Sequence, residues 1–295
     1  MNLSIKNISK TYSNGVQALK NVSLEINNGM FGLLGPNGAG KSTLMRTIAA
    51  LQDADNGSIM IGDINAAQDK QKLREILGYL PQEFGVYPKI SCYDLLDHMA
   101  VMKGMVDSRI RKEIVESLLH QTNLWDAKDR NLGTYSGGMK QRFGIAQALI
   151  GDPKLIIVDE PTAGLDPMER NRFHNLLSEI GENVIVILST HIVDDVRDLC
   201  NDMAIILDGE VKMVGEPIEL IKSLNGKVWK GLVDKNEVIK IEEQNQVISS
   251  RLHMGKVQVR VFSHTPLENS FEKTDAEIED LYFSTIHGLD LSGAE

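Results

Sequence analysis

The spacing of apolar residues along the chain changes several times, and these changes predict where strands and helices lie. Within residues 3–27, Val22, Leu24 and Ile26 alternate with polar residues, which is typical of half-buried antiparallel strands. Continuous apolar runs predict strands that are buried on both faces, as in a parallel sheet, at 30–34, 76–80, 155–158 and 184–189. Helical spacing separates several of these runs, so the pattern predicts an α/β fold.

Between about residues 91 and 150 the spacing of apolar residues is helical throughout. Ser91 and Asp94 form a capping-box pattern that predicts the start of one helix. Asp107 is placed to cap a second helix, and Ser136 opens a third. Because apolar stripes on helices are usually core positions, we expect a helical subdomain at about 91–150.

Residues 224–295 show a different pattern, which predicts a small C-terminal α+β domain. A final helix is expected at 276–283, and strands are expected at 228–233, 247–252 and 257–262. We therefore divide the chain into domains at residues 1–223 and 224–295.

The most specific chemical motif follows the first continuous apolar run. It fits the phosphate-binding pattern G-x-x-x-x-G-K-[ST], with a strand before it and a helix after it, in Gly35, Pro36, Asn37, Gly38, Ala39, Gly40, Lys41, Ser42 and Thr43. The glycines allow backbone N–H groups to turn inward around an anion, and the helix points its positive end at the phosphates. Lys41 would bind the β- and γ-phosphates, and Ser42 would ligate Mg²⁺.

Polar residues follow the other apolar runs at the point where each strand ends. Gln82 comes after one strand, and Asp159 and Glu160 come after the next. His191 comes after the last. Ligands of open α/β sheets bind at the carboxyl edge, so these groups would meet Lys41 if the strands are parallel. One of the two carboxylates would hold Mg²⁺, and the other would take a proton from an attacking water. A lone histidine such as His191 is more often a structural hydrogen-bonding residue than a catalyst.

Two further features allow more than one interpretation. Tyr12 precedes the hairpin turn Ser13–Gly15, where it would either stack on a nucleotide base or pack across the strands. A serine and two glycines at a helix N-terminus, Ser136, Gly137 and Gly138, form a second potential anion site, although serine caps are common.

Composition narrows the class of partner. The 295-residue chain carries a formal net charge of −10 and has no basic run, which argues against nucleic acid. Cys92 and Cys200 belong to no C-x-x-C pattern, so we expect two free thiols, buried or half-buried, in a reduced cytosolic setting. The chain begins without a signal peptide and has no apolar run long enough to span a bilayer. We therefore expect a soluble chain whose membrane role comes through a partner.

Taken in order, these motifs resemble those of the ATP-binding subunits of ABC transporters, over about residues 2–223. Tyr12 resembles the family's aromatic A-loop residue, residues 35–43 its Walker A motif and Gln82 its Q-loop glutamine. Residues 136–138 resemble the signature motif, and residues 155–160 resemble Walker B with its adjoining glutamate. Residues 163–166 resemble the D-loop, and His191 resembles the H-loop histidine. The usual LSGGQ signature ends here in Met139, a change that resembles a subset of bacterial exporters.

The resemblance implies a P-loop NTPase fold, with a RecA-like core, an antiparallel β subdomain and a helical subdomain. It implies an ATPase that uses ATP and Mg²⁺, with Lys41, Glu160 and His191 as catalytic residues and Ser42, Gln82 and Asp159 at the metal. Two subunits would pack head to tail, so that Ser136 and Gly138 of one cap the γ-phosphate held by the other. The site would be linked to a separate membrane permease through Gln82, the segment 84–90 and the helical insert. Binding to that permease would place the protein at the cytoplasmic face of the membrane.

The family resemblance leaves several alternatives. We expect export of a substrate by a homodimer, with a heterodimer as the other arrangement. A non-transport ABC ATPase acting on the ribosome is the alternative function, although a single set of motifs and a short insert disfavour it. A P-loop kinase would explain only residues 35–43. Residues 224–295 would stabilise or regulate the dimer, or form a plain surface extension.

Overall fold

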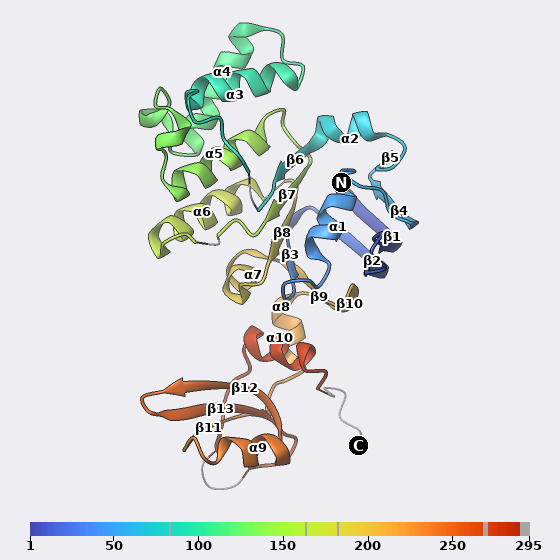
Figure 1. Cartoon of the computed structure of the whole chain (residues 1–295), viewed down its shortest axis with the longest axis vertical. Coiled ribbons are helices and arrows are strands. Elements are labelled where there is room, and N and C mark those ends of the chain that lie inside the picture. Colours follow the sequence, from blue (N-terminus) through green and yellow to red (C-terminus); the bar gives the residue numbers. More distant parts are fainter. Residues whose placement is uncertain (83, 163, 182, 268–270, 290–295) are drawn as a thin grey trace. The chain divides into compact units, whose positions relative to one another are not determined.

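The computed structural model describes residues 1–82, 84–162, 164–181, 183–267 and 271–289 (Figure 1). The chain forms two compact units. The first consists of Met1–Asn201 and Ile206–Val211, and the second takes Asp202–Ile205 and the chain from Lys212 onward. The domain boundary at residue 223 stays a prediction.

The N-terminal strands form an antiparallel sheet in the order β2-β1-β4-β5. Its strands are β1 (Asn2–Thr11), β2 (Gln17–Asn27), β4 (Asn56–Ile61) and β5 (Ile64–Asn65). Leu3 pairs with Ile26 and Ile5 with Leu24, and all of these side chains are buried. The alternating pattern in residues 3–27 therefore places one face of this sheet in the core, as predicted.

The larger sheet has the strand order β10-β9-β3-β8-β7-β6. Its strands are β3 (Gly29–Leu34), β6 (Leu77–Leu80), β7 (Leu155–Asp159), β8 (Ile185–Thr190), β9 (Asp202–Leu207) and β10 (Glu210–Gly215). Strands β3, β8, β7 and β6 are parallel neighbours, and every residue of β7 and β8 is buried. The parallel direction, which the predicted site required, is confirmed, and it brings the carboxyl ends of these strands to one edge.

Three helices gather into a helical subdomain: α3 (Cys92–Met102), α4 (Ser108–Gln121) and α5 (Gly137–Leu149) (Figure 1). Each begins where the sequence predicts, because the side chains of Ser91, Asp107 and Ser136 accept hydrogen bonds from first-turn N–H groups. Two 3₁₀ turns, Trp125–Ala127 and Leu132–Thr134, lie between α4 and α5. Buried apolar side chains, among them Leu96 and Phe143, form the core of this subdomain.

Three of the remaining helices in the described part of the first unit follow parallel strands, and the fourth precedes one. Helix α1 (Lys41–Ile48) begins at the P-loop, α6 (Pro167–Ile180) follows β7, and α7 (Val193–Leu199) follows β8. The apolar pattern does not predict helix α2 (Lys70–Ile76), and it wrongly assigns Ile76 to the next strand. Helix α2 is mostly polar and its buried residue is Leu73, so it shows no helical apolar stripe.

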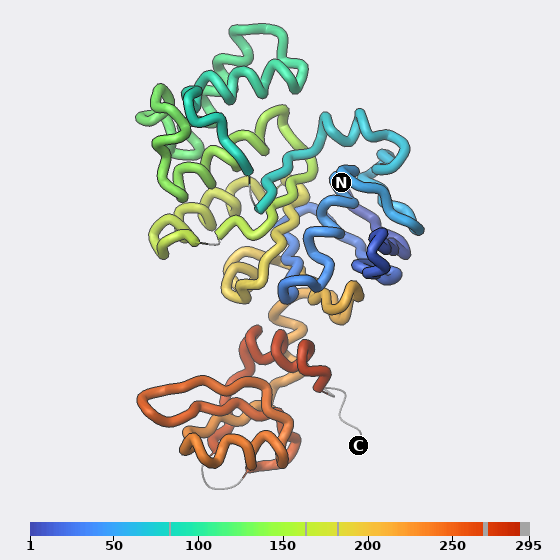
Figure 2. Tube along the Cα trace, in the orientation of Figure 1, coloured from blue at the N-terminus to red at the C-terminus, as the bar shows by residue number. Residues whose placement is uncertain are grey.

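The second unit contains an antiparallel sheet in the order β12-β13-β11-β14, and Figure 2 shows β12 and β13 as a long hairpin. The predicted strands and final helix are confirmed, whereas α8, α9 and β14 are additions. The elements are α8 (Pro217–Lys222), β11 (Val228–Val233), α9 (Val238–Gln244), β12 (Gln246–His253), β13 (Lys256–Phe262), β14 (Phe271–Lys273) and α10 (Ile278–Ile286). A bidentate ion pair joins sheet and helix, since Arg260 donates to both carboxylate oxygens of Asp280 at 2.6 Å.

Candidate functional site

The P-loop connects β3 to α1 at the carboxyl edge of the larger sheet. Gly40 precedes the first turn of α1 with a φ of 107°, a conformation that favours glycine. A Cβ at this position would lie 2.5 Å from the carbonyl oxygen of Ala18 on β2, so no larger residue fits. The first-turn N–H groups of α1 have no acceptor inside the helix, and they are therefore available to an anion.

Lys41 is buried although it carries a charge. Its Nζ donates to the carbonyl oxygens of Gly35 at 2.6 Å and Pro36 at 3.3 Å, and it lies 3.4 Å from Oε1 of Glu160. Phosphate oxygens bind an ammonium group more strongly than neutral carbonyl oxygens do. The lysine is therefore held close to the place where the motif would bind phosphate.

A cavity of about 560 Å³ opens over the P-loop, which is within the usual size of a small-molecule site. The predicted site residues that line it are Tyr12, Pro36, Asn37, Gly38, Gly40, Lys41, Ser42, Thr43, Gln82 and Glu160. Gly35 and Ala39 are buried parts of the same loop. The fold thus brings together residues from four separate predicted motifs.

Tyr12 borders this cavity with its ring partly exposed. Its hydroxyl lies 3.1 Å from Oγ1 of Thr43 and donates to Oε1 of Gln52 at 3.2 Å. These bonds join the end of β1 to the P-loop helix. The position suits an aromatic ring that stacks on a base at the cavity wall.

Asp159 ends β7 directly beside Ser189 of β8. Both side chains are buried, and in the described part of the chain Oδ1 of Asp159 and Oγ of Ser189 have no hydrogen-bond partner. An unpaired buried carboxylate oxygen is costly, and a cation would remove that cost. Asp159 therefore has the free acceptor that a Mg²⁺ ligand needs.

Glu160 is paired with His191. Oε2 of Glu160 accepts a hydrogen bond from Nδ1 of His191 at 2.6 Å, and the glutamate side chain is 5% exposed against 47% for the histidine. The backbone of Glu160 has a φ of 49°, a left-handed conformation that is strained for a non-glycine residue. Its N–H donates to the carbonyl oxygen of Ser189 at 2.8 Å, which ties it to β8.

The signature residues do not line this cavity. Ser136 caps α5, and Ser136 and Gly137 are exposed. A Cβ built on Gly137 meets no atom within 4 Å in the described parts of the chain. Gly138 instead packs against Glu169, whose carboxylate also pairs with Arg142. Of the D-loop residues, Ala163 lies outside the described residues, and Asp166 caps α6. One chain therefore presents its signature motif away from its own P-loop.

Sequence reasoning missed one wall of the cavity, formed by Gln17, Ala18 and Lys20 of β2 with Asp208 and Gly209 of a later turn. The N–H of Lys20 donates to Gly209 at 2.8 Å, and the N–H of Gly209 donates to Ala39 of the P-loop at 3.0 Å. In the sequence, Asp208 and Gly209 indicate only a hairpin turn. Their position beside the P-loop depends on a long-range contact that no local spacing predicts.

A parallel sheet with a P-loop at its carboxyl edge and a strand ending in Asp-Glu defines a P-loop nucleoside triphosphatase. Comparison with known proteins narrows the class. A family model described as ABC transporter matches residues 19–163. The chain is 32% identical to the uncharacterized ABC transporter ATP-binding protein YxlF of Bacillus subtilis, over 97% of this chain and 99% of that protein.

Two other comparisons agree. The linearmycin resistance ATP-binding protein LnrL of Bacillus subtilis is 35% identical, over 76% of this chain and 72% of that protein. A solved dimeric structure of the ATP-binding cassette MJ0796, in a post-hydrolysis state bound to ADP and Pi, matches with a TM-score of 0.66. That match has 28% identity and covers 72% of this chain and 98% of that one.

The chain belongs to the ATP-binding proteins of ABC transporters. It binds and hydrolyses ATP, and cassettes of this family work as dimers with membrane permeases. The predicted P-loop NTPase fold and family are confirmed, and the comparisons give no support to a ribosomal role. In the residues that the structure describes, no helix is long and apolar enough to cross a bilayer. Cys92 and Cys200 are free and buried, as expected.

Proposed function

We propose that two copies of this chain pair head to tail, hydrolyse Mg·ATP and drive export through a membrane permease. The observation that carries this proposal is the position of Glu160, which lines the P-loop cavity and accepts a hydrogen bond from His191. The exposed signature motif of the same chain is free to serve the other copy. The dimeric MJ0796 cassette bound to ADP and Pi supports the pairing.

In the proposed site, Lys41 and the first-turn N–H groups of α1 bind the β- and γ-phosphates, and Tyr12 stacks on the base. Ser42, Gln82 and Asp159 hold Mg²⁺, which neutralises phosphate charge when bound. The unpartnered Oδ1 of Asp159 and the position of Ser42 and Gln82 on the cavity wall fit this assignment. The few protein ligands suit Mg²⁺, which keeps several waters and takes others from phosphate.

Glu160 acts as the general base in this proposal. Its Oε2 accepts a hydrogen bond from His191, whereas Oε1 has no hydrogen-bond partner among the described residues and lies 3.4 Å from Nζ of Lys41. Oε1 is therefore the oxygen that can accept a proton from the attacking water once Lys41 turns to phosphate. His191 orients the carboxylate through Nδ1 and contacts the γ-phosphate from its exposed side.

The partner's signature motif completes the site. The N-terminus of α5 carries partial positive charge, and Ser136, Gly137 and Gly138 stand at this end. Since no atom of the described residues lies within 4 Å of a Cβ built on Gly137, a side chain placed there would not disturb that part of its own chain. Asp at this position would instead place a carboxylate against the phosphate held by the other copy.

A complementation experiment tests this arrangement. Lys41→Ala removes the lysine that binds phosphate but keeps the signature motif. Gly137→Asp blocks the signature motif but keeps Lys41, so each variant alone should be inactive. Mixed one to one, they should recover about a quarter of wild-type hydrolysis, because half of the pairs are mixed and each mixed pair has one intact site. Gly137→Ala is the matched control and should stay active. A mixture no more active than its components would contradict the shared site.

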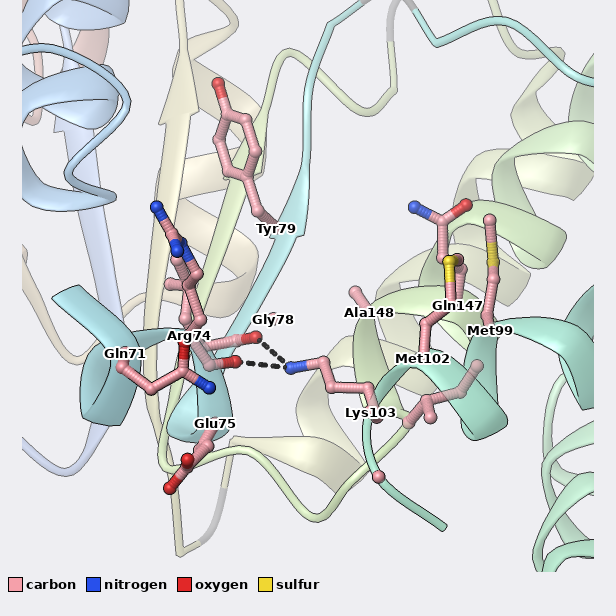
Figure 3. A pocket seen from close by; sticks show the side chains of 13 residues that line it. Gln71, Arg74, Glu75, Gly78, Tyr79, Met99, Met102, Lys103, Gln147 and Ala148 are labelled. Carbon is pink, nitrogen blue, oxygen red and sulfur yellow. Dashed lines mark hydrogen bonds between the residues drawn. The ribbon is translucent and has the colours of Figure 1, made fainter. Parts of the chain in front are cut away.

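We also propose where the permease binds. A cavity of about 590 Å³ lies between the helical subdomain and the α2–β6 segment (Figure 3). In this view Met99 and Met102 lie on the opposite side of the cavity from Arg74 of α2, and Nζ of Lys103 donates to the carbonyl oxygens of Arg74 at 2.7 Å and Leu77 at 2.9 Å. Strand β6 runs from this cavity toward Gln82 at the ATP site. Methionine side chains adapt to varied partners, which suits a docked permease helix.

Substitution of an exposed methionine tests this docking site. Met102 is 66% exposed, so Met102→Arg should leave folding and basal hydrolysis unchanged and weaken co-purification with the permease. Leu51 is 61% exposed and does not line this cavity, so Leu51→Arg is the matched control. Equal permease recovery with both variants would place the docking surface elsewhere.

The direction of transport and the role of the C-terminal part complete the proposal. Similarity to a linearmycin resistance protein and a signature that ends in Met139 support export. Binding to the permease would hold the chain at the cytoplasmic face of the membrane. We assign residues 1–223 to the ATPase domain and 224–295 to an accessory domain that stabilises or regulates the pair.

A further inference from the structure

Asp195, in helix α7, is a fully buried carboxylate that binds side chains from three other segments. Its Oδ1 accepts a hydrogen bond from Nε of Arg170 at 2.9 Å. It also accepts one from Nε2 of His174 at 2.8 Å, in the tautomer that carries a proton on Nε2. Both of these partners lie on α6. Its Oδ2 accepts from Oγ1 of Thr162 at 2.5 Å and from Oγ1 of Thr190 at 3.4 Å.

The two threonines connect Asp195 to the proposed catalytic pair. Thr162 follows Glu160 by two residues, and Thr190 directly precedes His191. Oγ1 of Thr190 also accepts from the N–H of Ile192 at 2.9 Å, so the backbone on both sides of His191 is fixed. One buried carboxylate thus holds the segment after β7 and the end of β8.

A buried carboxylate needs charged partners, and Asp195 has them. Burial alone would raise the pKa of Asp195, but hydrogen bonds from His174 and Thr162 and the Arg170 guanidinium outweigh burial and hold the pKa below its ordinary value. The carboxylate therefore stays ionised and keeps accepting these bonds at neutral pH. In the described chain its hydrogen bonds go to Arg170 and His174 of α6 and to Thr162 and Thr190, the neighbours of Glu160 and His191, rather than to that pair itself.

The strained backbone of Glu160 gives this network a function. A non-glycine residue with a φ of 49° persists only where the surrounding structure enforces it. The N–H of Glu160 is bonded to Ser189, next to Thr190, and Thr162 is bonded to Asp195. The network thus restrains the chain on both sides of the strained residue.

We propose that Asp195 is a positioning residue for ATP hydrolysis, which acts through Thr162 and Thr190 to hold Glu160 and His191 in line with the attacking water. This inference rests on the roles proposed above for Glu160 and His191. Misplacement of a catalytic group by about 1 Å costs on the order of 100-fold in rate. Loss of this anchor should therefore reduce turnover while nucleotide binding, which depends on the P-loop, is retained.

Asp195→Asn tests the proposal, because asparagine keeps the volume but removes the charge. We expect kcat to fall at least about tenfold, with KM for Mg·ATP within about twofold of wild type. In the Glu160→Gln background, the same change should leave Mg·ATP affinity unaltered. Asp198→Asn is the matched control, since Asp198 lies on the same helix but is exposed and pairs with Arg197, and it should match wild type.

Thr162→Val is a second variant in case Asp195→Asn does not fold. Valine has about the volume of threonine but lacks its hydroxyl. The change therefore removes one hydrogen bond and leaves Asp195 bonded to Arg170 and His174. We expect a selective loss in kcat that Thr162→Ser restores, because serine keeps the hydroxyl. A purely structural role would instead lower Mg·ATP affinity and kcat together, or would leave kcat unchanged in a folded protein.

The outcomes separate this inference from the function on which it rests. Wild-type kcat in folded Asp195→Asn or Thr162→Val, with Glu160→Gln inactive, would overturn the positioning role alone. A parallel fall in kcat and Mg·ATP affinity would do the same. Normal hydrolysis by Glu160→Gln would instead overturn the proposed base and, with it, the residue that Asp195 is said to position.

Discussion

Nδ1 of His191 lies 2.6 Å from Oε2 of Glu160, which joins a half-exposed imidazole at the end of β8 to a buried carboxylate at the end of β7. The two residues are far apart in sequence, and the parallel pairing of β7 and β8 brings them together. The contact gives the proposed base a fixed orientation in the absence of nucleotide. It also leaves Oε1 of Glu160 for the water.

Replacement of the histidine should separate binding from chemistry. His191→Ala removes the hydrogen bond that orients Glu160 and one proposed contact to the γ-phosphate, but it leaves the P-loop intact, so we expect only a small loss of Mg·ATP affinity. We expect kcat to fall by about 100-fold or more, the usual cost of losing a group that assists proton transfer. Steady-state hydrolysis and equilibrium binding of a fluorescent ATP analogue measure the two effects. Wild-type turnover would show that the contact is structural only.

A substitution at Gly40 should abolish nucleotide binding. Gly40→Ala would force a residue with a Cβ into a φ of 107° and toward the carbonyl oxygen of Ala18, 2.5 Å away. Positive φ of this kind costs about 1–3 kcal/mol, and the collision adds to it. We expect lower thermal stability and no measurable Mg·ATP binding. Gly137→Ala, at an open helical position, is the control, and equal behaviour of the two variants would contradict this explanation.

Much of the site follows from local sequence. The P-loop is predictable because a strand, a glycine-rich turn and a helix are consecutive, and each residue type has a phosphate-binding reason. Asp159 and Glu160 are predictable because a fully apolar strand delivers them to the sheet edge. Capping side chains at Ser91 and Asp107 set two helix starts for the same local reason.

Other parts depend on contacts between distant segments. Gly209 reaches the P-loop through a hydrogen bond to Ala39, and the sequence around it indicates only a turn. Asp195 has the appearance of an exposed acidic residue at a helix start, yet four side chains converge on it, from the turn after β7, the end of β8 and α6. Helix α2 was missed because its polar residues carry no apolar periodicity. Tertiary packing, rather than local propensity, determines each of these features.

The two thiols should be unreactive in the folded protein. Burial raises the pKa of Cys92 to about 11, partly opposed by a hydrogen bond with Tyr135, and burial raises the pKa of Cys200 as well. At pH 8 we expect a thiol reagent such as Ellman's reagent to modify neither cysteine until the protein unfolds. Rapid modification of either thiol under native conditions would contradict their burial.

The raised thiol pKa values also predict a pH dependence of stability. An unfolded thiol ionises near its ordinary pKa of 9.0, whereas the folded Cys92 keeps its proton to about 11. Stability should therefore decline as the pH rises from about 9 toward 11, because only the unfolded chain releases these protons. Urea unfolding at a series of pH values measures this decline, and the double variant Cys92→Ala, Cys200→Ala should show a shallower one. Identical slopes would assign the decline to other groups.

The second unit should depend on the Arg260–Asp280 pair. Asp280 is 1% exposed and receives two hydrogen bonds from Arg260, so Asp280→Ala leaves a largely buried guanidinium without its carboxylate. Breaking such a pair costs about 3–5 kcal/mol. We expect denaturant unfolding of this unit at lower concentration, with Mg·ATP affinity retained. Asp234→Ala, which removes an exposed pair with Lys256, should change little. Equal effects of the two variants would argue against the buried pair.

If one chain binds ATP and a second chain closes the site, the Glu160→Gln variant should form a stable pair, which its mass in solution would reveal. The variant should bind Mg·ATP without hydrolysing it, so size-exclusion chromatography with light scattering should show twice the 32.7 kDa of one chain with Mg·ATP. Without nucleotide, or with Gly137→Asp added, the mass should remain that of one chain. A mass of 32.7 kDa at saturating Mg·ATP would contradict the account.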